Sequence, residues 1–127
     1  MDTDGNVVTL TMPPRHQPAP LGEFELLVLL ATLGLGDAAY PFAIARDLET
    51  RTGRKVSRAA VLITLERLED KELVRSWYGD PTPQRGGRPK RFFQVKARGV
   101  QAVRESLGRI ETMAAGLDRV LKEKRGS

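Results

Sequence analysis

The sequence of 127 residues contains no cysteine and a single histidine, His16. The lack of cysteine excludes disulfides and thiolate metal ligands. The histidine lies in a proline-rich N-terminal segment, and no Ser/His/Asp set, metal-ligand cluster or Walker-type loop occurs. No apolar run approaches the roughly 18 to 20 residues that span a bilayer, and no signal peptide is recognisable. These absences argue against an enzyme, a cofactor or metal site and a membrane protein, and they indicate a cytoplasmic chain.

Acidic residues are absent from residues 82–98, although the whole chain carries 16 of them. Six of the 21 basic residues lie in this segment, and the other 15 nearly balance the 16 acids. The formal net charge of +5 therefore belongs to one stretch. A local basic patch indicates a polyanionic partner. The alternative is a solvated loop that is charged for solubility. The six basic residues of the segment are Arg85, Arg88, Lys90, Arg91, Lys96 and Arg98.

Three helices are expected after residues 1–20, a proline-rich segment that is predicted to be a mobile tail. The first helix spans residues 21–36 and is apolar on nearly all sides, as a central core helix would be. The second runs from Pro41 to Gly53, because proline suits the first turn of a helix and glycine its end. The third follows Ser57, a good N-cap residue.

The third helix combines a buried stripe with an outward face. Val61, Leu65 and Leu68 are spaced for the core, whereas Ile63 and Arg67 fall on the opposite side. Small side chains at the start of this helix would permit close approach to a partner. Two interpretations stay open for the outward residues. The isoleucine touches a thymine methyl or packs against the second helix, and the arginine binds DNA or pairs with a neighbouring acid.

Two strand-like segments follow, VRSWYG and KRFFQV, each rich in β-branched and aromatic residues. The stretch that joins them is too long for a tight turn, so the pair predicts a two-stranded hairpin with an extended basic tip. Phe93 and Val95 should face the core, with Lys90 and Phe92 on the other side. The adjacent pair WY either lines a ligand pocket or packs on the strand.

A long helix is expected over residues 97–123, because apolar residues recur at alternating spacings of three and four. Such a helix is about 40 Å long, at about 1.5 Å per residue, and a small domain cannot cover it. The seam partly folds back on the first helix or, for the uncovered remainder, pairs with a second copy of the chain. Residues 124–127 form a short tail. The expected dimer contacts are Val100, Val103, Leu107, Ile110, Ala114, Leu117 and Leu121.

Three helices followed by a basic hairpin make a winged helix-turn-helix over residues 21–96. The fold class is mainly α (α+β), with a long C-terminal dimerisation helix. A helix fits the major groove of DNA, and a hairpin beside it reaches the backbone or the minor groove. Double-stranded DNA is therefore the expected partner. The expected contacts are Ser57, Arg58, Ala59, Ile63, Thr64, Arg67, Arg85, Gly86, Gly87, Arg88, Lys90 and Arg91.

The segments LGEFELLVL, TLERLEDKELV and GDPTPQRGGRPKRFF resemble the PadR-like family of bacterial transcriptional regulators, over about residues 21–95. The resemblance implies a homodimer that is built on the C-terminal helix and represses a nearby promoter. It also implies, from some relatives, control by a small aromatic or drug-like molecule near the dimer interface. The sequence departs from the family at Leu62, where tyrosine is common, at Glu72, where glycine is usual, and at Lys96, where threonine is usual.

One rival interpretation is a winged helix that serves protein–protein contacts alone. RNA binding is less favoured, because exposed aromatic residues that could stack on bases are few. Salt dependence separates DNA binding from a role in protein–protein contacts alone, since a protein that neutralises several DNA phosphates must lose affinity for DNA steeply as salt rises. An inverted-repeat operator is the expected target of a two-fold dimer.

Overall fold

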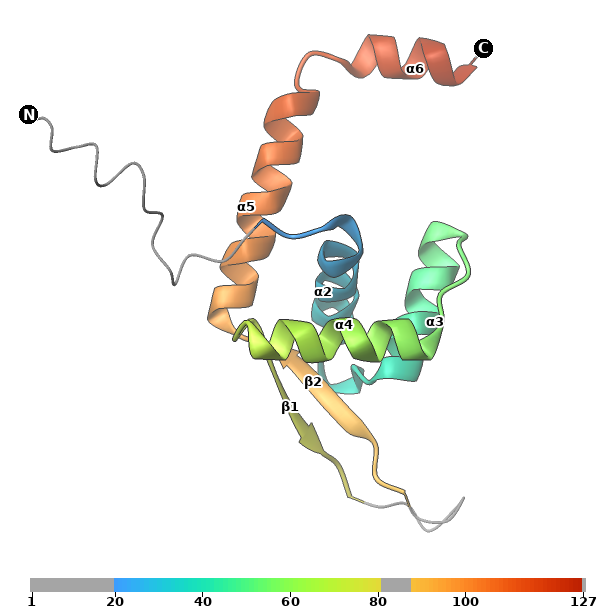
Figure 1. Cartoon of the computed structure of the whole chain (residues 1–127). Coiled ribbons are helices and arrows are strands. Elements are labelled where there is room, and N and C mark those ends of the chain that lie inside the picture. Colours follow the sequence, from blue (N-terminus) through green and yellow to red (C-terminus); the bar gives the residue numbers. More distant parts are fainter. Residues whose placement is uncertain (1–19, 81–87, 127) are drawn as a thin grey trace, which may run out of the picture.

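A computed structural model describes residues 20–80 and 88–126 of the chain. Helices α2, α3 and α4 form a bundle, from which the β1–β2 hairpin and the far end of α5 project in opposite directions (Figure 1). The predicted segment 1–20 lies outside the described residues except for its last residue. The elements are α2 (Glu23–Leu35), the 3-10 turn η1 (Gly36–Ala38), α3 (Pro41–Thr52), α4 (Arg58–Asp70), β1 (Val74–Tyr78), β2 (Arg91–Val95), α5 (Ala97–Ala114) and α6 (Asp118–Gly126).

Helix α2 is the central helix of the core, as its apolar sequence predicts. It packs on α3, α4, β2 and α5, and its buried residues form one hydrophobic cluster with those of these four elements. Leucines and β-branched residues that are withdrawn from water in this way supply the main driving force for folding. The fully buried side chains of the core include Val28, Leu29, Ile44, Val61, Leu65, Leu68, Leu73 and Phe93.

The boundaries of α3 and α4 follow the residues that predict them. Pro41 occupies the first turn of α3, and Gly53 ends that helix in a left-handed conformation, with φ at 75°. The Ser57 hydroxyl accepts a hydrogen bond from the backbone N–H of Ala60 at 3.0 Å, which caps the start of α4. Local residues thereby determine where α3 ends and where α4 begins.

The wing is an antiparallel pair in which Ser76 lies opposite Phe93, and Tyr78 lies opposite Arg91. Phe93 is fully buried, as expected, and its backbone N–H donates to the Ala39 carbonyl at 2.9 Å. Truncation of such a buried ring typically costs about 3–5 kcal/mol. One face of the hairpin is therefore part of the core.

Aromatic side chains hold the opposite face of the hairpin. The ring centroids of Phe92 and Trp77 lie 6.0 Å apart in a stacked arrangement, and Phe92 meets Tyr40 edge-on at 5.7 Å. Tyr40 directly precedes α3, so this ladder ties the wing to the α2–α3 connection. Such aromatic pairs contribute about 0.5–1.5 kcal/mol beyond their burial. Trp77 thus packs on the strand, the second of the two roles open to it.

The junction of α4 with β1 has an unusual backbone. Glu72 has a φ of 69°, the left-handed region that glycine favours. Its carboxylate pairs with Lys96 at 3.0 Å, and the neighbouring Lys71 pairs with Glu25 of α2 at 2.9 Å. The turn is therefore held from both sides by ion pairs.

Helix α5 begins with a close contact that only glycine permits. A Cβ added to Gly99 would collide with the Leu73 carbonyl oxygen and with Cγ1 of Val95. The N–H of Lys96 also donates to that carbonyl, at 2.8 Å. The first turns of α5 are thereby wedged against the base of the wing, and Ala102 and Val103 are buried in the core.

The prediction of one continuous helix over residues 97–123 is wrong. Helix α5 ends at Ala114, Ala115 leaves the helical conformation with ψ at 132°, and Gly116 completes the turn with a φ of 82°. Helix α6 then leaves in a different direction and runs to Gly126, so the predicted tail at 124–127 starts inside a helix (Figure 1). Within the described chain the far end of α5 has no packing to hold it, and glycine breaks an unpacked helix at little cost.

Candidate nucleic-acid interface

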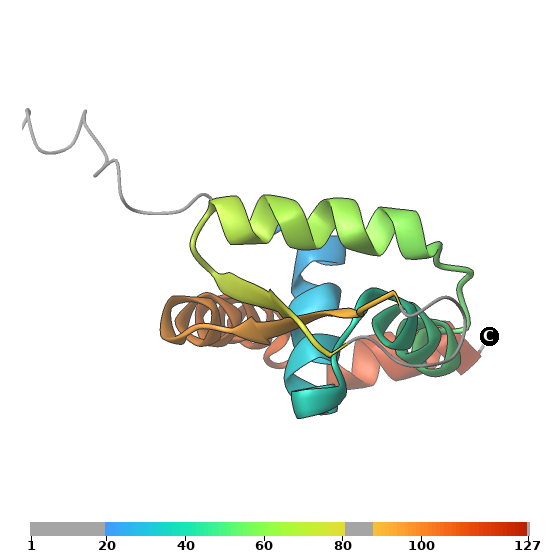
Figure 2. The same ribbon diagram turned by 90° about the horizontal axis from the view of Figure 1, so that it is seen from below.

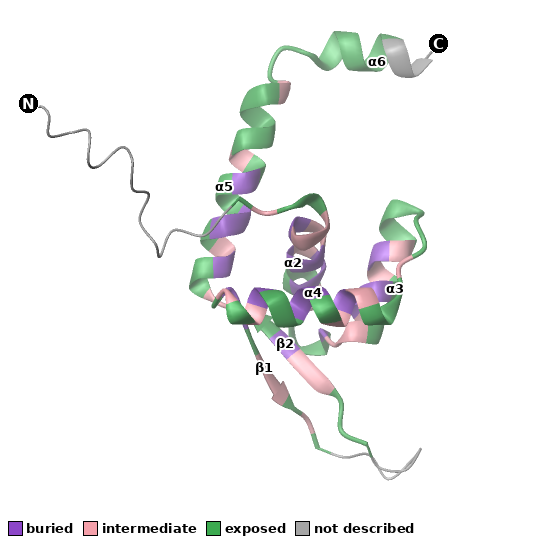
Figure 3. Cartoon of the chain, viewed as in Figure 1, coloured by how far each residue is buried: buried purple, intermediate pink, exposed green. Residues whose placement is uncertain are grey.

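Helix α4 presents an uncovered face to solvent. Ile63 is 56% exposed, which favours the outward alternative over burial against α3. Arg67 lies one turn further along on the same face and is also exposed. Among the described residues Arg67 has no acid within ion-pair distance, although its charge helps to lower the pKa of Glu25 on α2. In Figure 3 the exposed residues of α4 are green and alternate with buried residues in purple.

The start of α4 adds backbone donors to that face. Ser57, Arg58 and Ala59 are all exposed, and the first turn of the helix contains no acidic residue. The N–H groups of a helix's first turn, together with its dipole, attract anions. The structure thus brings three of the predicted contact residues together at one end of the helix.

The prediction that Thr64 contacts DNA is corrected by its burial. Its side chain is only 5% exposed and faces the core beside Val61 and Leu65. A helix turns by about 100° per residue, so the residue that follows the outward Ile63 is carried toward the core. Thr64 cannot reach a base edge without leaving the domain interior.

The wing contributes exposed cations near its tip. Arg88 and Lys90 are exposed, and the Lys90 ammonium lies 4.6 Å from the centre of the Tyr40 ring. Seen from below, α4 and the hairpin lie on neighbouring sides of the domain (Figure 2). The predicted contacts Arg85, Gly86 and Gly87 lie outside the described residues.

Arg91, the last of the predicted wing contacts, is engaged within the protein instead. Its guanidinium pairs with Glu66 at 3.1 Å and with Glu69 at 2.9 Å, both on α4. Its Nε donates to the Ser76 hydroxyl at 3.2 Å. Sequence reasoning missed the two glutamates as partners of the wing. The signal was available, because a period of two places Arg91 on the same face as the buried Phe93.

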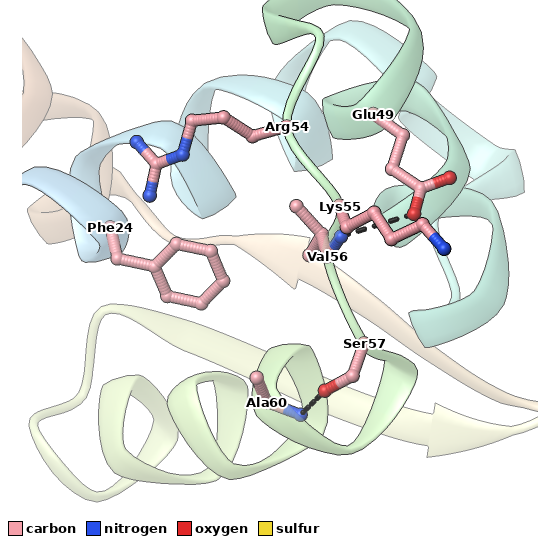
Figure 4. A pocket seen from close by; sticks show the side chains of 7 residues that line it. All are labelled: Phe24, Glu49, Arg54, Lys55, Val56, Ser57 and Ala60. Atoms are coloured by element: carbon pink, nitrogen blue, oxygen red, sulfur yellow. Dashed lines mark hydrogen bonds between the residues drawn. The ribbon is translucent and has the colours of Figure 1, made fainter.

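A pocket of about 460 Å³ opens beside the start of α4, between α2 and the end of α3 (Figure 4). Phe24 forms one wall, and Arg54 and Lys55 line it from the segment before α4. The carboxylate of Glu49 accepts the N–H of Val56 at 3.1 Å and is thereby used within the fold. The lining as a whole consists of Phe24, Glu49, Arg54, Lys55, Val56, Ser57 and Ala60.

The predicted seam on the C-terminal helix divides into two parts. Val103 is buried in the chain's own core and Val100 is half-buried, so the assignment of Val103 to a dimer contact is corrected. The remaining seam residues lie beyond the reach of the domain, on the mostly exposed far end of α5, in the turn that follows it and on α6 (Figure 3). Ala114 is half-buried, and the exposed apolar residues are Leu107, Ile110, Met113, Leu117, Val120 and Leu121.

Two further features bear on the classes of site that the chain offers. Over residues 20–80 and 88–126, no group of three or more histidine, cysteine, aspartate or glutamate side chains is placed to hold a metal ion. None of the helices in this same part of the chain is both long and apolar enough to cross a bilayer.

A scan against protein-family models and a search of curated proteins each found no match. Solved structures do match. A PadR family transcription regulator from Clostridium difficile R20291 is 18% identical, with 79% of this chain and 99% of that one covered and a TM-score of 0.61. A PadR family regulator from Eggerthella lenta DSM 2243 is 22% identical, with 78% and 86% covered and a TM-score of 0.59.

A PadR-like transcriptional regulator from Bacillus cereus strain ATCC 14579 is 13% identical, with 77% of this chain and 90% of that one covered and a TM-score of 0.62. The matches extend over three quarters of this chain and nearly all of each relative. The expected class, a mainly helical fold with a two-stranded wing and a C-terminal helix, is confirmed by this similarity. The chain has the winged-helix fold of PadR family transcriptional regulators.

Proposed function

We propose that this chain is a sequence-specific DNA-binding transcriptional regulator that places α4 in the major groove and the β1–β2 wing beside it. One observation carries the proposal: the outward face of α4 leaves Ile63 and Arg67 uncovered, and the hairpin on the neighbouring side of the domain carries the exposed cations Arg88 and Lys90 (Figure 2). An exposed isoleucine costs free energy in water, and contact with a thymine methyl would give it a use.

The contacts divide by chemistry. Arg67 would bind guanine or a phosphate, and Ile63 would read a thymine methyl. Ser57, Arg58 and Ala59 would meet the backbone at the helix start, where N–H groups favour phosphate. Arg88 and Lys90, together with the undescribed Arg85, Gly86 and Gly87, would follow the phosphates of the neighbouring groove.

The active form in this proposal is a homodimer that binds an inverted repeat. The uncovered apolar residues of α5 and α6 suit a second copy of the same chain, and a two-fold axis presents two α4 helices and two wings. Half-sites about one helical turn apart, near 34 Å, match such a pair. Occupancy of a promoter would exclude polymerase, so we assign a repressor role in the cytoplasm of a bacterial cell.

Release of DNA by a small aromatic anion is the second part of the proposal. The pocket that Phe24, Arg54 and Lys55 line also includes Ser57 and Ala60, which belong to the start of α4. A ligand bound there would compete with DNA for the same end of the helix. Titration of small aromatic carboxylates against the DNA complex tests this, with Arg54→Gln as the variant that should lose the response.

The test of DNA binding is selection of bound fragments from a genomic pool, followed by affinity measurements over a range of KCl concentrations. We expect a steep linear fall of log affinity with log salt. Arg88→Met should weaken binding to all sequences and reduce that slope by about 0.9, the share of one phosphate contact. Ile63→Ala should change sequence preference and leave the slope unchanged.

A protein that binds no genomic fragment at low salt would contradict the proposal and favour the rival, a winged helix for protein–protein contacts alone. Binding whose slope does not respond to Arg88→Met would remove the wing from the interface. Footprinting of the selected fragment checks the dimer, because an inverted repeat should give two protected half-sites.

A further inference from the structure

The most connected side chain at the candidate interface is that of Arg91, the first residue of β2. The strand register places it opposite Tyr78 and on the same face as Ser76 and Phe93. Phe93 is buried in the core, so this face of the hairpin turns toward the bundle and not toward solvent. The Arg91 guanidinium thereby lies over the Phe93 ring, with its central carbon 5.0 Å from the ring centre.

Each kind of nitrogen in the Arg91 guanidinium has a partner. Nη1 donates to Glu66 at 3.1 Å, Nη2 donates to Glu69 at 2.9 Å, and Nε donates to the Ser76 hydroxyl at 3.2 Å. The Ser76 hydroxyl in turn donates to the Glu69 carboxylate at 2.9 Å. This closed network joins β1, β2 and α4. The side chain of Arg91 is 24% exposed, so the network is partly shielded from solvent.

Removal of the guanidinium would do more than break these bonds. Glu66 and Glu69 lie one turn apart on α4, and both would lose the cation that compensates them. Uncompensated charges that are partly withdrawn from water destabilise the folded state. The same two carboxylates lie on the helix proposed to enter DNA, where they would repel phosphates.

Arg88, three residues earlier on the wing, is a matched contrast. It is exposed, and it has no hydrogen bond or ion pair among the described residues. The two arginines carry the same charge on the same hairpin. Only Arg91 has carboxylate partners on α4.

We propose that Arg91 is a positioning residue that fixes the angle between the wing and α4 through Glu66, Glu69 and Ser76, and not a cation that contacts DNA. This role rests on the proposed DNA-binding function. The wing is then anchored at its base, and contact with phosphates falls to Arg88, Lys90 and the residues nearer its tip.

The test is a double-mutant cycle read on DNA. Arg91→Met keeps the apolar stem and removes the charge, and it is made in the wild-type background and in a Glu66→Gln/Glu69→Gln background. We expect Arg91→Met to weaken binding about tenfold in the first background and less than about twofold in the second. The salt slope should change little, whereas Arg88→Met lowers it by about 0.9 and shows no coupling to the glutamates.

Equal losses in both backgrounds, of any size including none, would overturn the positioning role, and a slope reduced by about one would identify a direct phosphate contact instead. The same four proteins without DNA give an independent readout. Urea unfolding should show a coupling of at least about fivefold in the equilibrium constant, and amide exchange of the β1–β2 pairs should accelerate in Arg91→Met. A chain that binds no DNA refutes the proposed function, while absence of coupling in this second arm refutes the network itself.

Discussion

Glu72 is the single non-glycine residue in the described chain that has a positive φ. A side chain in the left-handed region brings its Cβ close to the backbone carbonyl, which is why glycine is favoured there. The family that the sequence resembles usually has glycine at this position. The ion pair with Lys96 does not require the strained backbone, because a long acidic side chain could reach a lysine from many conformations.

Substitution Glu72→Gly should therefore stabilise the protein, because relief of the strained backbone outweighs the loss of an exposed ion pair. We expect the melting temperature to rise by a few degrees, as measured by calorimetry at neutral pH. Glu72→Gln is the control, since it removes the charge and keeps the strain, and it should leave the melting temperature equal or slightly lower. A fall in melting temperature for the glycine variant would contradict this account.

Individual residues also mark how far sequence reasoning reaches. Ser57 and Gly53 are predicted correctly, because a helix cap depends on the residue itself and its nearest neighbours. The positions of Thr64 and Arg91 are not, since each depends on what packs against it. Arg91 finds its carboxylates 22 and 25 residues earlier in the chain, and only the fold brings them together.

At the scale of elements, one ion pair joins the first turn of α2 to the end of α4. Glu25 accepts from Lys71 Nζ at 2.9 Å and from the Gly22 N–H at 3.0 Å. Burial by itself raises the pKa of Glu25, but the hydrogen bonds from Lys71 and Gly22 outweigh it, and the pKa is held below its ordinary value. Folding thus favours the charged carboxylate, so this stabilisation is present above the ordinary pKa and is lost as the pH falls through the lowered one.

Glu25→Gln should lower the free energy of unfolding by about 1 kcal/mol at pH 7. The difference from wild type should shrink toward zero as the pH falls below 4.5, the ordinary pKa, because the wild-type carboxylate then becomes protonated as well. Urea unfolding of both proteins over a series of pH values measures this difference in the free energy of unfolding. Glu23→Gln is the matched control, since Glu23 is exposed and lies 3.8 Å from its partner Arg54. A difference that does not vary with pH would exclude the linkage.

Elements are predictable from the sequence to the extent that local signals and packing agree. The three helices and the hairpin follow from their periodicity and end signals, and the structure has them all. The extent of the C-terminal helix does not follow from its sequence pattern. The heptad spacing continues through Gly116, whereas packing of this helix on the domain stops before that residue. Spacing alone cannot show that the far half of this helix has no packing partner among the described residues of the chain.

At the scale of the whole molecule, the exposed apolar residues of α5 form the surface on which the proposed dimer depends. Leu107 and Ile110 are 41% and 55% exposed, and they continue the face that Val103 buries in the core. Leu107→Glu combined with Ile110→Glu should convert a dimer to a monomer, because two charges would be buried in a self-complementary contact. Sedimentation equilibrium measures the change in mass.

The control for this prediction is Thr112→Glu, which lies on the opposite side of α5 at about 100° per residue and should leave the dimer intact. The double variant should retain the helical content of the wild type by circular dichroism. It should bind a single half-site far more weakly than the dimer binds the full operator, since linked sites gain from effective concentration. A dimer that survives both glutamates would place the interface elsewhere.

Gly99 couples the orientation of α5 to that of the DNA-binding elements proposed above. Its lack of a side chain lets the start of α5 bear directly on Leu73 and Val95, where α4 gives way to the wing. In the proposed dimer, the C-terminal end of α5 would contact the second copy of the chain. A change in the orientation of the two copies would therefore move α4 and the wing together as one rigid body. It would change the distance between the two α4 helices and so the half-site spacing that the dimer fits.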